Sequence, residues 1–265
     1  MRLNSYVLTE GRGTQIEEGD AISFIKTHCK KALKAFLDND ILYRGMEYNG
    51  EYYHIDPKTG TRESANTSNE YTLIMDGNSR WKEYPKRSKS LVCTTSSRKT
   101  DSYGHTYMVF AKDGSRYGVC PKDDLWDSFS TFGGMNMSSV NHYLRDLALE
   151  TGDGEIYNAN TYQKLMYNIT SMGEYLDDIV KNRTEAGDDV IDRLMDNDIF
   201  RMWYKVKHNP FTEWFIGLYD PNKNDFYVTE DVSKIFSTGV KSKEVWTDGE
   251  SILVEFSYDF NEKLK

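Results

Sequence analysis

The sequence is poor in cysteine and lacks a metal-binding pattern. Its three cysteines, Cys29, Cys93 and Cys120, form no Cys-x-x-Cys pair, and its five histidines lack the spacing of a zinc site. A low and odd number of cysteines argues against a disulfide framework and favours a reducing compartment. We therefore expect a cytoplasmic protein without a structural metal ion.

Long hydrophobic runs and phosphate-binding loops are missing as well. No run reaches the roughly 18 apolar residues of a membrane-spanning helix, and the start of the chain lacks the apolar core of a secretory signal. Neither a G-x-G-x-x-G nor a G-x-x-x-x-G-K-[ST] motif occurs, which excludes phosphate loops of those kinds. These absences predict a protein with no membrane partner.

Proline is scarce, and no linker divides the chain. Its five prolines lie in no proline- or serine-rich stretch, and the 265 residues contain no internal repeat. Apolar residues make up only 38%, but 19 tyrosines supply rings that can be buried while their hydroxyls are hydrogen-bonded. The chain can therefore bury a sizeable core, and we expect one domain over residues 1–265.

Charge is unevenly distributed around a net value of −9. Residues 80–119 hold nine Lys or Arg and three acids, whereas residues 120–200 hold six basic and sixteen acidic residues. The balance excludes a protein whose whole surface coats DNA. It leaves open phosphate contacts through residues 82–99. The acidic residues between Glu174 and Asp192 are either a solvated face or a surface for a basic partner.

Hydrophobic periodicity predicts an α+β fold with mainly antiparallel sheets, an N-terminal helix and a helical insertion at about 135–210. Asp20 is the expected N-cap of the first helix, and the turn at residues 112–115 is expected to join two strands as a hairpin. Two further hairpins are expected, at residues 213–229 and 243–256. The predicted helices are 20–38, 138–150, 160–181 and 186–201, and the predicted strands are 41–43, 90–97, 105–111, 116–120, 213–219, 225–229, 243–246 and 251–256.

Three short motifs could carry chemistry. Arg44 and Gly45 follow a predicted strand. At that position a guanidinium could bind a phosphate or carboxylate, and glycine would let a ligand approach the backbone. The alternative is a solvated Arg before a turn. Thr94, Thr95 and Ser96 close another strand, and their hydroxyls can hold a ribose or bond their own backbone.

The third motif places Glu244 at a strand start, where a carboxylate can stabilise a cation or accept a sugar hydroxyl. The alternative is a solvated edge residue beside Lys243.

Two other groups favour a structural interpretation. Asp123 and Asp124 are adjacent and point in different directions on a regular element, so we expect them to cap a helix start. Cys93 or Cys120 could pair with a histidine, His105 or His142, as a nucleophile, but a cysteine in an apolar strand is ordinarily a small hydrophobic residue.

In their order, the three motifs resemble the mono-ADP-ribosyltransferase fold, in its Arg–Ser–Glu class. That family has a helix before a strand ending Tyr-Arg-Gly, then a strand with a Ser-Thr-Ser type motif, then a Glu-x-Glu motif. The counterparts here are Tyr43-Arg44-Gly45, Thr94-Thr95-Ser96 and Ser242-Lys243-Glu244. The amino-acid composition, which is rich in Tyr, Asn and Asp, is also similar to that of tailed-bacteriophage proteins.

The resemblance implies an NAD-dependent enzyme that releases nicotinamide and transfers ADP-ribose to a macromolecule of the host cell. Arg44, Gly45 and the residues Thr94, Thr95 and Ser96 would bind NAD, and Glu244 would act with Arg44 and Thr94 in catalysis. Tyr43, Tyr103 or Trp246 would stack on nicotinamide.

One departure from the family concerns the acceptor. Ser242 replaces the first Glu, which in the family supports transfer to arginine, so the acceptor stays open, with a protein favoured over nucleic acid. The alternative function is a non-enzymatic phage inhibitor or virion protein that binds its partner through the acidic face.

Overall fold

The computed structural model describes residues 13–62, 69–152, 158–182, 184–206, 209–237, 239, 242–257 and 260–264. The chain divides into two compact units. The first unit takes residues 1–65, 82–128 and 225–265, and the second takes residues 66–81 and 129–224.

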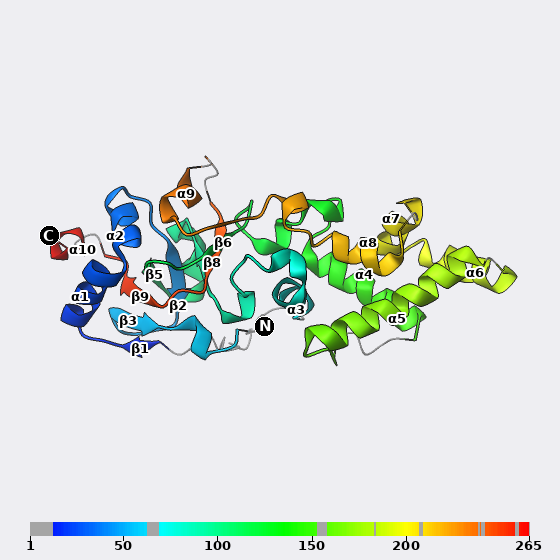
Figure 1. The fold of residues 1–265 in the computed structure, drawn as a ribbon, viewed down its shortest axis with the longest axis horizontal. Coiled ribbons are helices and arrows are strands. Elements are labelled where there is room, and N and C mark those ends of the chain that lie inside the picture. Colours follow the sequence, from blue (N-terminus) through cyan, green and yellow to red (C-terminus); the bar gives the residue numbers. More distant parts are fainter. Residues whose placement is uncertain are drawn as a thin grey trace. The chain divides into compact units, whose positions relative to one another are not determined.

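Figure 1 labels the helices and strands. The first unit contains β1 (Thr14–Gln15), α1 (Glu18–His28), α2 (Lys30–Leu37), β2 (Tyr43–Met46), β3 (Tyr52–Ile55), β4 (Leu91–Thr94), β5 (His105–Ala111), β6 (Tyr117–Val119), β7 (Tyr227–Thr229), α9 (Val232–Phe236), β8 (Glu244–Thr247), β9 (Ser251–Glu255) and α10 (Phe260–Lys263). The second contains α3 (Glu70–Gly77), α4 (Met137–Glu150), α5 (Tyr162–Lys181), α6 (Glu185–Leu194), α7 (Asp198–Val206) and α8 (Phe211–Gly217).

One antiparallel sheet organises the first unit, in the order β1-β3-β9-β5-β2-β4-β8-β6-β7. Strands β2 and β4 join the two halves of this order through the register pair Tyr43↔Thr94. In one half β5 pairs with β2 and β9, and in the other β8 pairs with β4 and β6. The predicted α+β class with an antiparallel sheet is therefore confirmed.

The N-terminal helical segment packs on the sheet as two helices, whereas the sequence predicts one helix over 20–38. The Asp113 carboxylate, from the turn after β5, accepts hydrogen bonds from Lys30 N–H at 3.1 Å and Lys31 N–H at 2.8 Å. These two hydrogen bonds cap the start of a new helix, α2, so the helical segment is interrupted at Cys29. The predicted cap at Asp20 is also wrong, because α1 begins earlier, after Glu17.

Two predicted hairpins of the first unit are wrong. Strand β6 pairs with β7 and β8 rather than with β5, and β9 pairs with β3 and β5 rather than with β8. In both cases the expected turn carries an aspartate that serves another element. Asp113 caps α2, and Asp248 accepts from Arg116 Nη2 at 2.8 Å. A turn signal marks a reversal of the chain without fixing which strands pair.

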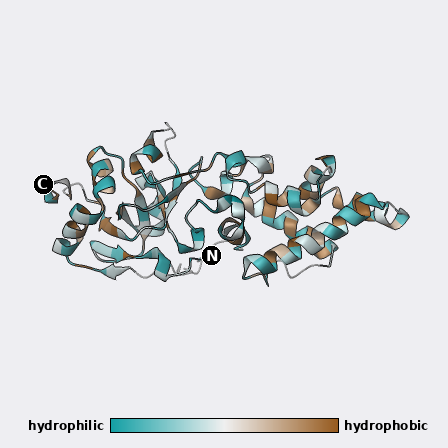
Figure 2. Cartoon of the chain, viewed as in Figure 1, coloured by the Kyte–Doolittle hydropathy of each residue, from teal (hydrophilic) through white to brown (hydrophobic). Residues whose placement is uncertain are grey.

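Helices build the second unit. Hydrophobic and hydrophilic residues alternate along them (Figure 2), and α5 buries the stripe Leu165, Ile169, Met172 and Leu176. The hairpin predicted over 213–229 is wrong, because residues 211–217 form α8 and β7 pairs with β6.

The prediction of one domain with an insertion near 135–210 stays a prediction. Among the described residues of this region, α4, α5, α6 and α7 all belong to the second unit, and the predicted helix over 186–201 is interrupted between α6 and α7. Asn197 lies at that interruption, where its Oδ1 accepts from Phe200 N–H at 3.1 Å.

Candidate functional site

Three strands that are neighbours in the sheet carry the three motif residues. Arg44 is in β2, Thr94 ends β4 and Glu244 begins β8, and the strand order places β4 between the other two. Thr94 lies directly opposite Glu244, so their side chains project from the same face of the sheet. The fold thus brings Thr94 and Glu244 together, although they are far apart in the sequence. Tyr43 is the residue of β2 that lies opposite Thr94, so the side chain of Arg44, the next residue, projects from the other face of the sheet at this pair.

Two donors of the chain hold the Glu244 carboxylate. Arg87 Nη2 donates to Oε1 at 2.5 Å, and Leu125 N–H donates to Oε2 at 3.1 Å. The Glu244 side chain is 15% exposed and that of Arg87 is 3% exposed. The interpretation of Glu244 as a solvated edge residue is therefore wrong. Each carboxylate oxygen can accept two hydrogen bonds, so the oriented group keeps capacity for a ligand hydroxyl.

The sequence shows Arg87 only as one residue of the basic segment and gives no sign of its contact with Glu244. The Arg87 guanidinium carbon lies 5.5 Å from the centroid of the Trp246 ring. Trp246 Nε1 donates to Pro85 O at 2.8 Å, and its ring lies so close to Gly118 that an added Cβ would come within 2.2 Å. No local pattern could have found this pair, because its partners are 157 residues apart.

The hydroxyls at the end of β4 bond to backbone groups. Thr94 Oγ1 accepts from Ser96 N–H at 3.2 Å. Thr95 Oγ1 accepts from Lys243 N–H at 2.9 Å, and Thr95 N–H donates to Lys243 O at 3.1 Å. Thr95 thus ties the residue before Glu244 to β4, which fixes where β8 begins.

Lys243 anchors the segment before Glu244. Its side chain is buried, and Nζ donates to Ile235 O at 2.7 Å and to the Tyr227 hydroxyl at 3.1 Å. Burial lowers the pKa of Lys243. The chain therefore buries a lysine next to the candidate carboxylate and connects it to β7 and α9 rather than to Glu244.

Arg44 and Gly45 lie inside β2 rather than after it, so the predicted strand 41–43 ends too early. Arg44 Nη1 donates to Val92 O of β4 at 3.0 Å. A Cβ added at Gly45 would come within 2.6 Å of Thr100 O and 2.7 Å of Tyr103 Cβ. The space beside Gly45 is therefore filled by the turn that follows β4, and this packing alone requires glycine.

The three predicted stacking aromatics differ in access. Trp246 is fully buried, Tyr43 packs edge-on against Phe256 at 5.6 Å between ring centroids, and Tyr103 is 54% exposed. Tyr103 therefore has the most exposed ring of the three.

The paired aspartates serve separate local roles. Asp124 accepts from Trp126 N–H at 2.8 Å and caps a 3₁₀ turn, as predicted. Asp123 pairs with Lys99 Nζ at 2.6 Å. No shared acid–base site forms from these two carboxylates.

The cysteines are not candidate nucleophiles. All three are buried, and burial raises the pKa of Cys29 to about 12 and that of Cys120 well above its usual range. His105 pairs with Glu255 and His142 pairs with Asp146. The structure gives the thiol–histidine alternative no support.

Most cations of the basic segment already have acidic partners. Six of the nine Lys and Arg residues between 80 and 119 form ion pairs with carboxylates of the chain. They are Arg80, Lys82, Arg87, Lys99, Lys112 and Arg116. The positive charge that the sequence shows is therefore largely balanced where it lies, which weakens the expectation of nucleic-acid contact through residues 82–99.

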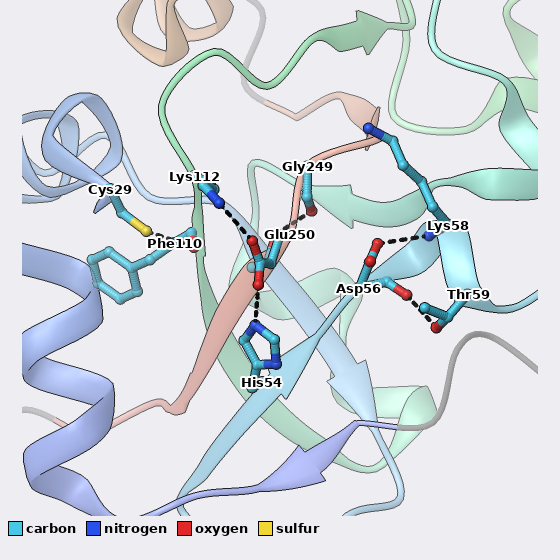
Figure 3. A network of polar contacts seen from close by, with 10 residues as sticks. Cys29, His54, Asp56, Lys58, Thr59, Phe110, Lys112, Gly249 and Glu250 are labelled. Atoms are coloured by element: carbon cyan, nitrogen blue, oxygen red, sulfur yellow. Dashed lines mark hydrogen bonds and ion pairs between the residues drawn. The ribbon is translucent and has the colours of Figure 1, made fainter. Parts of the chain in front are cut away.

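A second polar cluster surrounds Glu250, just before β9 (Figure 3). Its carboxylate accepts from Lys112 Nζ at 2.8 Å and bonds His54 Nε2 at 2.8 Å. The nearby Cys29 thiol donates to Phe110 O at 3.4 Å. The cluster contains the Glu250 carboxylate, the His54 imidazole and a Cys29 thiol that burial keeps protonated. We therefore interpret these contacts as stabilising the fold rather than as a catalytic site.

Glu250→Gln is expected to lower the free energy of unfolding at neutral pH by up to about 1 kcal/mol. Hydrogen bonds from Lys112 and then His54 lower the pKa of Glu250 in the folded chain. The contribution is therefore present above the ordinary value of 4.5 and is lost as pH falls through the lowered pKa. Denaturation of both proteins across pH should show curves that converge in acid. A difference that persists below about pH 3 would contradict this origin.

Comparison with protein-family models, curated proteins and solved structures finds no match to this chain. Within the described ranges, no helix has the length and apolar character needed to cross a membrane. The same residues contain no group of three or more His, Cys, Asp or Glu that could hold a metal ion.

Proposed function

We propose that this chain is an NAD-dependent mono-ADP-ribosyltransferase, which releases nicotinamide and transfers ADP-ribose to a macromolecule of the cell, in a host cell if a phage encodes it. The observation that supports this best is the register pair between Thr94 and Glu244, on strands next to each other and next to the strand of Arg44. In the Arg–Ser–Glu class that the sequence resembles, three such residues act on one NAD molecule. We propose the same type of sheet for the first unit.

Each residue has a role that suits its chemistry. By the resemblance alone, the Arg44 guanidinium would pair with the phosphate oxygens of NAD, because its planar donors match that geometry. Thr94 would order the ribose next to nicotinamide. The Glu244 carboxylate would accept a hydrogen bond from the ribose 2′-hydroxyl and stabilise positive charge at C1′.

The proposed reaction breaks the bond between C1′ and the ring nitrogen of nicotinamide. The electron pair passes to that nitrogen, so the pyridinium of NAD leaves as neutral nicotinamide. A nucleophilic atom of the acceptor then bonds to C1′ and gives up its proton to solvent. Glu244 stays a carboxylate throughout and acts by position and charge.

The geometry narrows the predicted NAD contacts. We propose Thr94 and Ser96 as direct contacts and keep Arg44 on the resemblance alone. Gly45 is left out because it packs against Thr100, and Thr95 because its hydroxyl bonds Lys243. Gly45 and Thr95 would shape the site without contacting NAD.

The acceptor is proposed to be a protein, at a residue other than arginine. Ser242 stands where the arginine-specific members of the class have a glutamate, and its Oγ is buried with no hydrogen-bond partner within the described residues. A nucleic acid is disfavoured because most cations between 80 and 119 are paired with carboxylates of the chain.

Nicotinamide release from NAD, with transfer of labelled ADP-ribose to proteins of a cell lysate, tests this function. Glu244→Gln is expected to lower release at least about 100-fold, the usual cost of losing charge stabilisation at a transition state. Glu255→Gln, which alters a carboxylate on β9, is the matched control and should leave the rate unchanged. Equal release by the wild type and Glu244→Gln would sink the proposal.

A non-enzymatic binding protein, such as a phage inhibitor or virion component, is the second candidate. It is favoured by the exposed acids on α5 and α6, among them Glu174, Asp178, Asp188 and Asp192. Asp177 differs from these exposed acids, because it is partly buried and its carboxylate accepts a hydrogen bond from Phe211 N–H. A pull-down that recovers a basic partner in equal amount, from a chain without NAD turnover, would favour this candidate.

A further inference from the structure

We propose that Arg87 is a positioning residue, which fixes the Glu244 carboxylate in the orientation that stabilises charge at C1′. This inference rests on the proposed function and names a further residue for it. Arg87 would touch neither NAD nor the acceptor and would act only through Glu244.

The backbone of Glu244 is set without Arg87. Glu244 N–H donates to Lys122 O at 3.0 Å, and its carbonyl accepts from Cys120 N–H at 2.9 Å. What remains to be fixed is the side chain, whose rotation would otherwise turn the carboxylate away. Arg87 holds one of its oxygens and Leu125 N–H holds the other, so both ends of the group are defined.

Arg87 is itself held firmly enough to serve this role. Its side chain is 3% exposed and lies over the ring of Trp246, two residues after Glu244 on the same face of β8. The indole bonds Pro85 O, which joins the segment before Arg87 to the strand. A buried guanidinium in a fixed place loses little freedom when it orients its partner, and preorganisation of this kind is what charge stabilisation requires.

The first unit offers a matched control in a second pair of the same kind. Arg116 Nη2 bonds the Asp248 carboxylate at 2.8 Å, just after β8, and the Arg116 side chain is 41% exposed. Arg116→Gln breaks an Arg–carboxylate pair of the same unit without touching Glu244. It should leave nicotinamide release unchanged.

Steady-state kinetics of nicotinamide release by the full chain test the role. Arg87→Gln is expected to lower kcat at least about tenfold with KM for NAD within about twofold, the pattern of an interaction that acts in the transition state. Arg87→Lys keeps the charge and should give an intermediate kcat. In a Glu244→Gln background, Arg87→Gln should change kcat by less than about twofold, because its effect passes through Glu244.

The outcomes separate this inference from the proposed function. If Glu244→Gln abolishes release while Arg87→Gln keeps the wild-type kcat, Arg87 has no positioning role and the function stands. If Glu244→Gln releases nicotinamide as fast as the wild type, both the proposed function and the positioning role of Arg87 are overturned. A rise in kcat in Arg87→Gln would overturn positioning and indicate an inhibitory contact. Should Arg87→Gln fail to fold by circular dichroism, Arg87→Lys decides, and an unchanged kcat in that variant overturns the inference.

Discussion

Trp246→Ala is expected to lower the free energy of unfolding by about 3–5 kcal/mol. The indole is fully buried, stacks on Tyr84 at 6.1 Å between ring centroids and covers Gly118. Alanine leaves a cavity on the sheet and removes the donor to Pro85 O, so a buried carbonyl loses its partner. The loss also removes the surface on which Arg87 lies.

Chemical denaturation followed by circular dichroism measures this effect. Trp126→Ala is the matched control, because Trp126 lies in the same unit, is only half-buried and contributes its backbone N–H rather than its ring to Asp124. It should cost less than about 1 kcal/mol. Equal losses in the two variants would show that the indole of Trp246 is not a central part of the core.

Phe211→Ala is the second change with a large expected effect, again about 3–5 kcal/mol, in the second unit. The ring is fully buried, 5.4 Å from the centroid of Trp203 and stacked on Phe215 at 5.8 Å. Asp177 accepts from the backbone N–H of residue 211, a bond that alanine keeps. The variant therefore removes the ring and leaves the helix start intact.

Tyr167→Ala is the control for Phe211→Ala, since Tyr167 is an aromatic residue of the same unit that is 75% exposed. Its loss should change the free energy of unfolding by less than about 0.5 kcal/mol. The reverse order of the two effects would contradict the packing of α8.

Local periodicity predicted the elements that depend on their own residues. The strand 105–111 is found as predicted, and the helix predicted over 160–181 begins only two residues later. Both follow from a repeat that side chains within a few residues determine. The aromatic run around Phe211 and Phe215 misled the prediction, because such residues favour strands on average while their spacing of four buries one helical face.

Strand pairing and the full site lie beyond local patterns. The turn at Lys112–Ser115 resembles a hairpin turn, yet Asp113 is committed to α2 and the following strand pairs elsewhere. Arg44, Thr94 and Glu244 could be selected because their order in the chain resembles a family. Arg87 could not, since nothing near it in the sequence specifies its contact with Glu244.

The interrupted order of the first unit has a consequence for synthesis on the ribosome. Tyr52 of β3 pairs with Val254 of β9. The ribosome therefore synthesises all of the second unit after β3 and before the partner strand β9. Helices α4 to α8 contact one another and can form earlier, because local contacts close faster than distant ones. During that interval the backbone edge of β3 lacks β9, and we expect nascent chains to depend on chaperones until β9 emerges.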